Sequence, residues 1–112
     1  TWIDRRTRVL VYSKPIDMRW SFERLSFLVR EEIGEKIDIG DLYLFLGHNR
    51  KRLKGLRFDG SGLVLFTKRI EKRTFMLVSD LEGRPEITRA ELELFIHGSV
   101  LRKYLPEGRS HV

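Results

Sequence analysis

The sequence lacks cysteine altogether, contains only three prolines, and has no apolar run long enough to cross a membrane. The absence of cysteine excludes disulfides and thiolate chemistry and is typical of a cytoplasmic bacterial protein, the location we expect. No phosphate-binding glycine loop, dinucleotide fingerprint or nucleophile motif occurs, so the sequence indicates neither an enzyme nor a cofactor. The three histidines lie in separate segments without ligand spacing, so we expect no metal site.

Positive charge is what the sequence has in excess. Its net charge of +6 favours an anionic partner, with nucleic acid first. The charge is concentrated in the segments 48–57 and 68–73, which together carry +8. Their basic residues are the candidate nucleic-acid-binding residues: Arg50, Lys51, Arg52, Lys54, Arg57, Lys68, Arg69, Lys72 and Arg73.

Five short strands are predicted from β-branched and aromatic residues separated by turn residues. They cover 8–12, 42–46, 52–58, 63–68 and 74–78. In the third strand the alternation of apolar and polar residues breaks between Leu53 and Leu56, around Gly55, which predicts a bulge. The segment Asp59–Gly62 that follows predicts a tight hairpin turn.

Two helices are also predicted. The first should begin at Asp17 as its N-terminal cap and end at Gly34, because Asp accepts from free helix amides and Gly favours a helix end. The second should begin at the capping box of Thr88 and Glu91 and end near Gly98. Apolar residues recur at helical spacing along the first helix and should pack on the sheet. They are Met18, Phe22, Leu25, Leu28, Val29 and Ile33.

These elements give the order β-α-β-β-β-β-α, an α+β fold in a single domain of residues 1–112, with an antiparallel meander and two helices. The core should cover about 8–99, and residues 100–112 should form a flexible tail. In a meander, alternate turns lie at the same end of the sheet. The basic turns at 49–52 and 71–73 are alternate turns, so we expect them to converge, with the Asp59 turn at the opposite end.

Three motifs occur in order along the chain. They are Pro15-Ile16-Asp17-Met18-Arg19, the stretch Arg52–Leu63 around the Asp59 turn, and Lys68-Arg69-Ile70-Glu71 with Phe75 behind it. Together they resemble the small accessory proteins called TnpB in insertion sequences of the sixty-six family, and not the RNA-guided nucleases of the same name. Ile16 replaces a threonine of the family pattern, and Phe58 replaces a tryptophan. The resemblance spans 8–99 and implies a role in bacterial DNA transposition beside a larger transposase, with no catalytic residue.

Three hypotheses follow. The first is a non-catalytic accessory protein that holds DNA phosphates on the two basic turns, without base recognition because neither helix is strongly basic. The second is a protein-interaction module that docks on the transposase of the same element without touching DNA. The third, ranked last, is a nuclease in which Asp17, Asp59 and Glu71 hold a metal ion. His48 could contact phosphate or be a solvated loop residue. A homo-oligomer stays open, and no membrane partner is expected.

Overall fold

The computed structural model describes residues 7–34, 40–75 and 86–97. Within this part of the chain no helix has the length and apolar character needed to cross a bilayer. The predicted α+β class, with two helices and a meander, is confirmed. The elements are β1 (Val9–Val11), α1 (Phe22–Leu28) with its π-helical continuation η1 (Val29–Ile33), β2 (Leu42–Leu46), β3 (Arg52–Phe58), β4 (Leu63–Arg69), β5 (Glu86–Ile87) and α2 (Arg89–Ile96).

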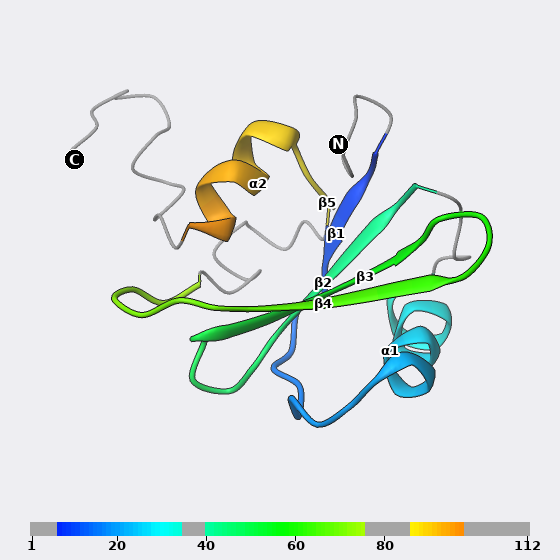
Figure 1. Ribbon diagram of the computed structural model, residues 1–112, viewed down its shortest axis with the longest axis horizontal. Coiled ribbons are helices and arrows are strands. Elements are labelled where there is room, and N and C mark those ends of the chain that lie inside the picture. The colour runs from blue at the N-terminus through cyan, green and yellow to red at the C-terminus, as the bar shows by residue number, and fades with distance from the viewer. Residues whose placement is uncertain (1–6, 35–39, 76–85, 98–112) are drawn as a thin grey trace.

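The sheet has the strand order β4-β3-β2-β1-β5 (Figure 1). Strands β2, β3 and β4 form the predicted antiparallel meander. Strand β1 pairs with β2 in parallel, with Val9 opposite Leu42 and Val11 opposite Leu44, so the sheet is mixed. Parallel neighbours need a crossover connection, and the segment that contains α1 supplies it. The first half of the chain is therefore a β-α-β unit that places α1 on one face of the sheet.

The two helices cover opposite faces of the sheet (Figure 1). On the α1 face, Leu25, Leu28 and Val29 pack against Tyr43 and Phe45 of β2. These three helical residues are nearly inaccessible to solvent, as their apolar spacing predicts. Phe22 belongs to the same predicted stripe, but it is 41% exposed because it begins the helix at the edge of this layer.

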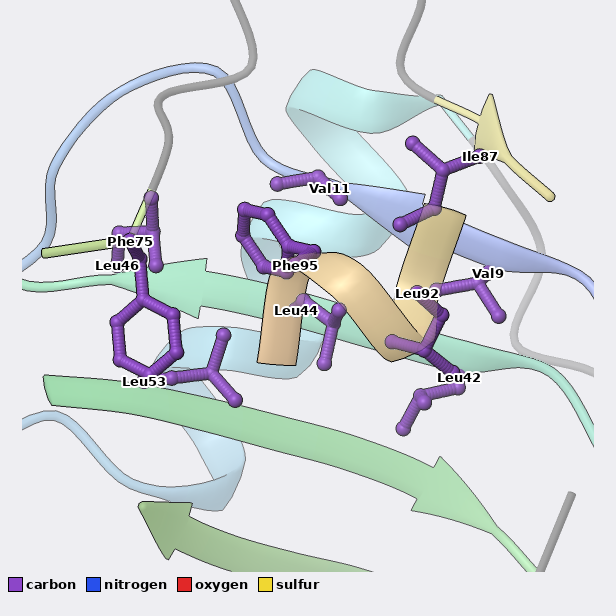
Figure 2. Packing of buried hydrophobic residues seen from close by; sticks show 10 residues of the cluster. All are labelled: Val9, Val11, Leu42, Leu44, Leu46, Leu53, Phe75, Ile87, Leu92 and Phe95. Atoms are coloured by element: carbon purple, nitrogen blue, oxygen red, sulfur yellow. The ribbon is translucent and has the colours of Figure 1, made fainter. Parts of the chain in front are cut away.

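The α2 face carries the second core cluster (Figure 2). Leu92 and Phe95 of α2 pack over Leu42, Leu44 and Leu46, which alternate along β2 with the residues that face α1. Burial on both faces explains why β2 is apolar at every position.

The first helix begins later than the sequence predicts. Its N-cap is Ser21, which makes no side-chain capping bond, and Asp17 is not the cap. The backbone amide of Ile16 donates to the Leu46 carbonyl (2.8 Å), so this segment continues alongside β2 instead of turning into a helix. The predicted end at Gly34 is confirmed, because this residue has a left-handed φ of 79°.

No bulge occurs at Gly55. Strand β3 keeps an unbroken register, with Gly55 opposite Leu44 on one side and Phe66 on the other. The apolar phase changes because Leu53 packs in the α2-face cluster and Leu56 in the α1-face cluster. Glycine is required because the ring of Phe66 lies over it, and a Cβ at position 55 would be 2.1 Å from a ring carbon.

The predicted fifth strand over 74–78 is not seen where it can be checked. Residues 74–75 belong to no strand, and 76–78 lie outside the described residues, as do Gly98 and the tail 100–112. The fifth strand in the structure is β5, antiparallel to β1. The capping box that opens α2 is confirmed, since the Glu91 amide donates to Thr88 Oγ1 (3.1 Å) and the Thr88 amide donates to Glu91 Oε1 (2.8 Å).

Candidate nucleic-acid interface

The two basic turns meet at one end of the sheet, as the meander predicts. Arg52, the first residue of β3, is paired with Arg69, the last residue of β4. Just beyond this pair, the Ile70 amide donates to the Lys51 carbonyl (3.0 Å), so one turn is hydrogen-bonded to the other. Figure 1 shows the turns together at the left of the sheet and the Asp59 turn at the right.

Phe75 fixes the second turn to the core. Its amide donates to the carbonyl of Arg50 (2.7 Å), and Arg50 itself has a left-handed φ of 59° in the first turn. The Phe75 side chain is fully buried and its ring centroid lies 5.7 Å from that of Phe95 on α2. Figure 2 shows it beside Leu46 and Leu53. The basic turns are thus held by backbone hydrogen bonds and by a buried aromatic anchor.

We call the cations at this end the basic rim. Arg52, Arg69, Lys72 and Arg73 are exposed, whereas the others are half-buried. Two rim side chains have weak partners in the described part of the chain: Lys51 Nζ donates to the Arg73 carbonyl (3.2 Å), and Arg69 lies 3.7 Å from Glu71. The basic rim consists of Arg50, Lys51, Arg52, Lys68, Arg69, Lys72 and Arg73.

Two candidate residues from the sequence lie away from the basic rim. Lys54 is buried on the α1 face at 9% exposure, and its ammonium group donates to the carbonyl of Trp20. Arg57 lies near the opposite end of β3, paired with Leu42 and Val64. Lys54 is enclosed, and Arg57 is five residues further along an extended strand than Arg52, so neither belongs to the group of cations that the two turns bring together.

The carboxylate of Asp17 is hydrogen-bonded to Arg19. The Arg19 guanidinium donates Nη2 to Oδ2 (2.6 Å) and Nε to both carboxylate oxygens (3.0 and 3.1 Å), while the Arg19 amide donates to Oδ1 (2.9 Å). These hydrogen bonds hold the pKa of Asp17 well below its usual range. Asp17 and Arg19 therefore form a local ion pair, and Asp17 is not the helix cap that the sequence predicts.

Asp59 stabilises its own turn. Its Oδ1 accepts from the amides of Ser61 and Gly62 (both 3.0 Å) and from the Ser61 hydroxyl (3.2 Å), and the two backbone bonds are the main reason that its pKa is lowered. Asp59 and Glu71 lie beyond opposite ends of the β3–β4 pair. Among residues 7–34, 40–75 and 86–97, no three His, Asp or Glu side chains are grouped so that they could hold a metal ion.

A pocket of about 500 Å³ opens beside the basic rim. The sequence did not predict it, because two of its lining residues, Ile16 and Met18, come from the segment before α1, far along the chain from the basic turns. Ile16 forms a bridge to Gly47, and Met18 packs so closely on Gly47 that a Cβ there would lie 2.9 Å from Met18 Cγ. The pocket thus joins the first and third sequence motifs. It is lined by Ile16, Met18, Gly47, His48, Asn49, Lys51, Arg52, Arg69, Ile70 and Glu71.

Comparisons with known proteins give one matching family model and two uncharacterized relatives. The family model described as "IS66 Orf2 like protein" matches residues 7–105. Two proteins of Sinorhizobium fredii (strain NBRC 101917 / NGR234), named "Uncharacterized protein y4jC" and "Uncharacterized protein y4hO", are 29% and 32% identical over 94 residues. Each alignment covers 84% of this chain, with 80% of the first relative and 82% of the second. No solved structure matches.

Proposed function

Because this chain belongs to the IS66 Orf2-like family, whose members are accessory proteins of insertion-sequence transposition, we propose that it binds DNA phosphates through the basic rim. In this proposal the protein is non-catalytic and works beside the transposase of its element. The supporting observation is the convergence of two basic turns that are separate in the sequence and hydrogen-bonded in the fold. Phosphate contacts supply most of the affinity of sequence-independent DNA binding, and lysine and arginine side chains make them.

The way in which the rim is held favours this function. Binding through surface loops usually costs conformational entropy, because the loops and their side chains become ordered. Here Ile70 and Phe75 tie one turn to the backbone of the other, so the two sets of cations are already placed side by side before DNA arrives. Glu71 is the carboxylate that accompanies them in the turn, and it lies at 3.7 Å from Arg69, a distance typical of a weak surface pair.

The binding should not depend on base sequence. Base recognition in duplex DNA usually requires a helix or a β-ribbon in the major groove. Neither α1 nor α2 contributes a residue to the basic rim. The rim side chains come from turns and strand ends, which suit contacts with phosphate oxygens.

A salt titration tests the proposal. Arg52 and Lys72 are exposed rim residues from different turns, and no hydrogen bond within the described residues involves either side chain. Reversing both to glutamate should weaken binding to unrelated duplexes alike. The slope of log affinity against log salt should fall by about 0.9 for each phosphate that the variant no longer neutralises.

Arg24 and Arg30 provide the matched control. Both are exposed on the first helix and its continuation, away from the basic rim. Their reversal to glutamate changes the net charge by the same amount but should leave the salt slope nearly unchanged. If the rim variant binds duplex as tightly as the parent at every salt concentration, DNA binding by the rim is wrong. Docking of the rim on an acidic surface of the transposase then becomes the leading function, to be tested by pull-down after nuclease treatment.

A further inference from the structure

The pocket beside the basic rim has apolar lining residues that phosphate binding does not explain. Its apolar lining residues are half-buried Met18 and Ile70, with Ile16, 1% exposed, packed behind them. Duplex DNA presents phosphates at its surface and keeps its bases stacked inside. A pocket lined by both apolar residues and cations therefore fits a ligand that carries both an anionic group and an apolar surface.

The walls of the pocket narrow the class of ligand. Lys51, Arg52 and Arg69 supply cations, and Glu71 supplies an acceptor. The amide oxygen of Asn49 is occupied by the Lys51 backbone amide (2.9 Å), so its NH₂ group is left as a donor. Nucleobases offer donors and acceptors along their edges, with apolar faces on either side. The NH₂ donor of Asn49 and the acceptor Glu71 together suit a base edge that carries both an acceptor and a donor.

We propose that this pocket binds one unpaired nucleotide of DNA, with its phosphate on Lys51, Arg52 and Arg69 and its base over Met18 and Ile70. The proposal rests on the proposed DNA binding and adds a substrate class, DNA with unpaired nucleotides at an end. The volume of about 500 Å³ lies in the range of small-ligand pockets. His48, an exposed residue of the pocket lining, can stack on the base as aromatic side chains do in single-strand binding.

A spectroscopic test uses the low methionine content of the chain. The sequence contains two methionines, so ¹³C-methyl labelling gives two signals, and the Met18→Leu variant assigns one of them. Deoxynucleoside monophosphates should shift the Met18 methyl signal in a saturable way, whereas deoxyribose 5-phosphate should shift it much less because it has no base. A Met18 signal that does not respond to nucleotides overturns the proposal. So does a signal that responds only to an acidic, leucine-containing peptide, which would indicate protein docking.

A binding test separates this proposal from the proposed function. The parent should bind a duplex with a short single-stranded overhang about five- to tenfold more tightly than the same duplex with blunt ends. Met18→Ala and His48→Ala should bring this ratio close to one. Phe27→Ala, an exposed apolar truncation on α1, should leave it unchanged. Because His48 is exposed, its variant keeps the test valid if Met18→Ala fails to fold.

The possible failures differ. If Lys72→Glu with Arg73→Glu leaves blunt-duplex affinity unchanged, the proposed function is wrong, whatever the overhang ratio. If that variant weakens blunt-duplex binding but overhang and blunt DNA bind equally well to the parent, the rim binds DNA and the nucleotide pocket is wrong. The nucleotide pocket is also wrong if Met18→Ala and His48→Ala both keep the parent's preference for overhang DNA over blunt DNA.

Discussion

The two ends of the sheet use charge in opposite ways. At the Asp59 end, one carboxylate oxygen accepts three hydrogen bonds from its own turn, so the charge is consumed in stabilising the backbone. At the rim end, the turns are held by backbone hydrogen bonds and by buried Phe75, and the exposed cations contribute little to the stability of the turns. A charged turn is therefore a candidate binding site when its backbone is stable without the charge.

Strand β3 connects the two ends and shows the same contrast along its length. Arg52 is exposed at the rim, whereas Lys54, two residues later, is enclosed and bonded to the Trp20 carbonyl. Both have the same charge and nearly the same place in the sequence. Substitutions at these two positions and at the turns can test whether a charged residue serves stability or binding, because the free energy of unfolding and the DNA affinity are measured separately.

The largest effect is expected for Phe75→Ala, which tests whether the rim turns depend on their aromatic anchor. The ring is fully buried against Phe95, Leu46 and Leu53, so its removal should cost about 3–5 kcal/mol of unfolding free energy. Denaturant unfolding measures this loss. Val64→Ala, at a 42% exposed position on β4, should cost less than about 1 kcal/mol. Equal losses in the two variants would show that the second turn is not anchored by Phe75.

A smaller loss is expected for Gly55→Ala in the middle of the sheet. The new Cβ would lie 2.1 Å from the Phe66 ring, so that ring must move, at a cost of about 1–3 kcal/mol. Adding Phe66→Leu should recover part of the loss. Gly62→Ala at the Asp59 end is the control, because no atom lies within 4 Å of its added Cβ. Thermal unfolding in which Gly55→Ala matches the parent would contradict the close packing of Phe66 on Gly55.

Local signals in the sequence predicted local structure correctly. Thr88 and Glu91 form their capping box because the bonds join residues three apart, and Gly34 ends its helix through its own backbone conformation. The convergence of the basic turns was also predictable, because it follows from the topology of a meander.

Features that depend on distant contacts were not predictable in the same way. Aspartate is a favoured N-cap residue, but the bridge between Ile16 and Gly47 keeps the chain extended at Asp17, and the helix begins after Ser21. The apolar alternation of β3 shifts at Gly55 because Leu53 and Leu56 are buried on opposite faces of the sheet. The sequence of β3 by itself does not show that both of its faces are covered. One signal was available for Lys54, which shares a face with Leu56 by strand alternation and therefore points toward α1.

Lys54→Met should lower stability by about 1 kcal/mol and leave DNA binding nearly unchanged. The substitution keeps most of the apolar stem but removes the ammonium donor, so the Trp20 carbonyl loses its partner. Arg52→Met is the counterpart from the same strand. It should leave the unfolding free energy within about 0.5 kcal/mol of the parent and weaken DNA binding. Reversed results would mean that Lys54, and not Arg52, belongs to the interface.

The smallest effect is expected for Asp59→Asn and should depend on pH. The amides of Ser61 and Gly62 hold the pKa of Asp59 below its ordinary value. The stability that the ionised carboxylate contributes is therefore full above its unfolded pKa, near 3.8, and is lost as the pH falls through the lower folded value. The variant should melt below the parent near pH 7, and the gap should narrow at about pH 2–3. Glu31→Gln, at an exposed position on η1, should show no such gap. A gap for Asp59→Asn that keeps its size in acid would show that the charge does not stabilise this turn, and the contrast between the two ends would fail.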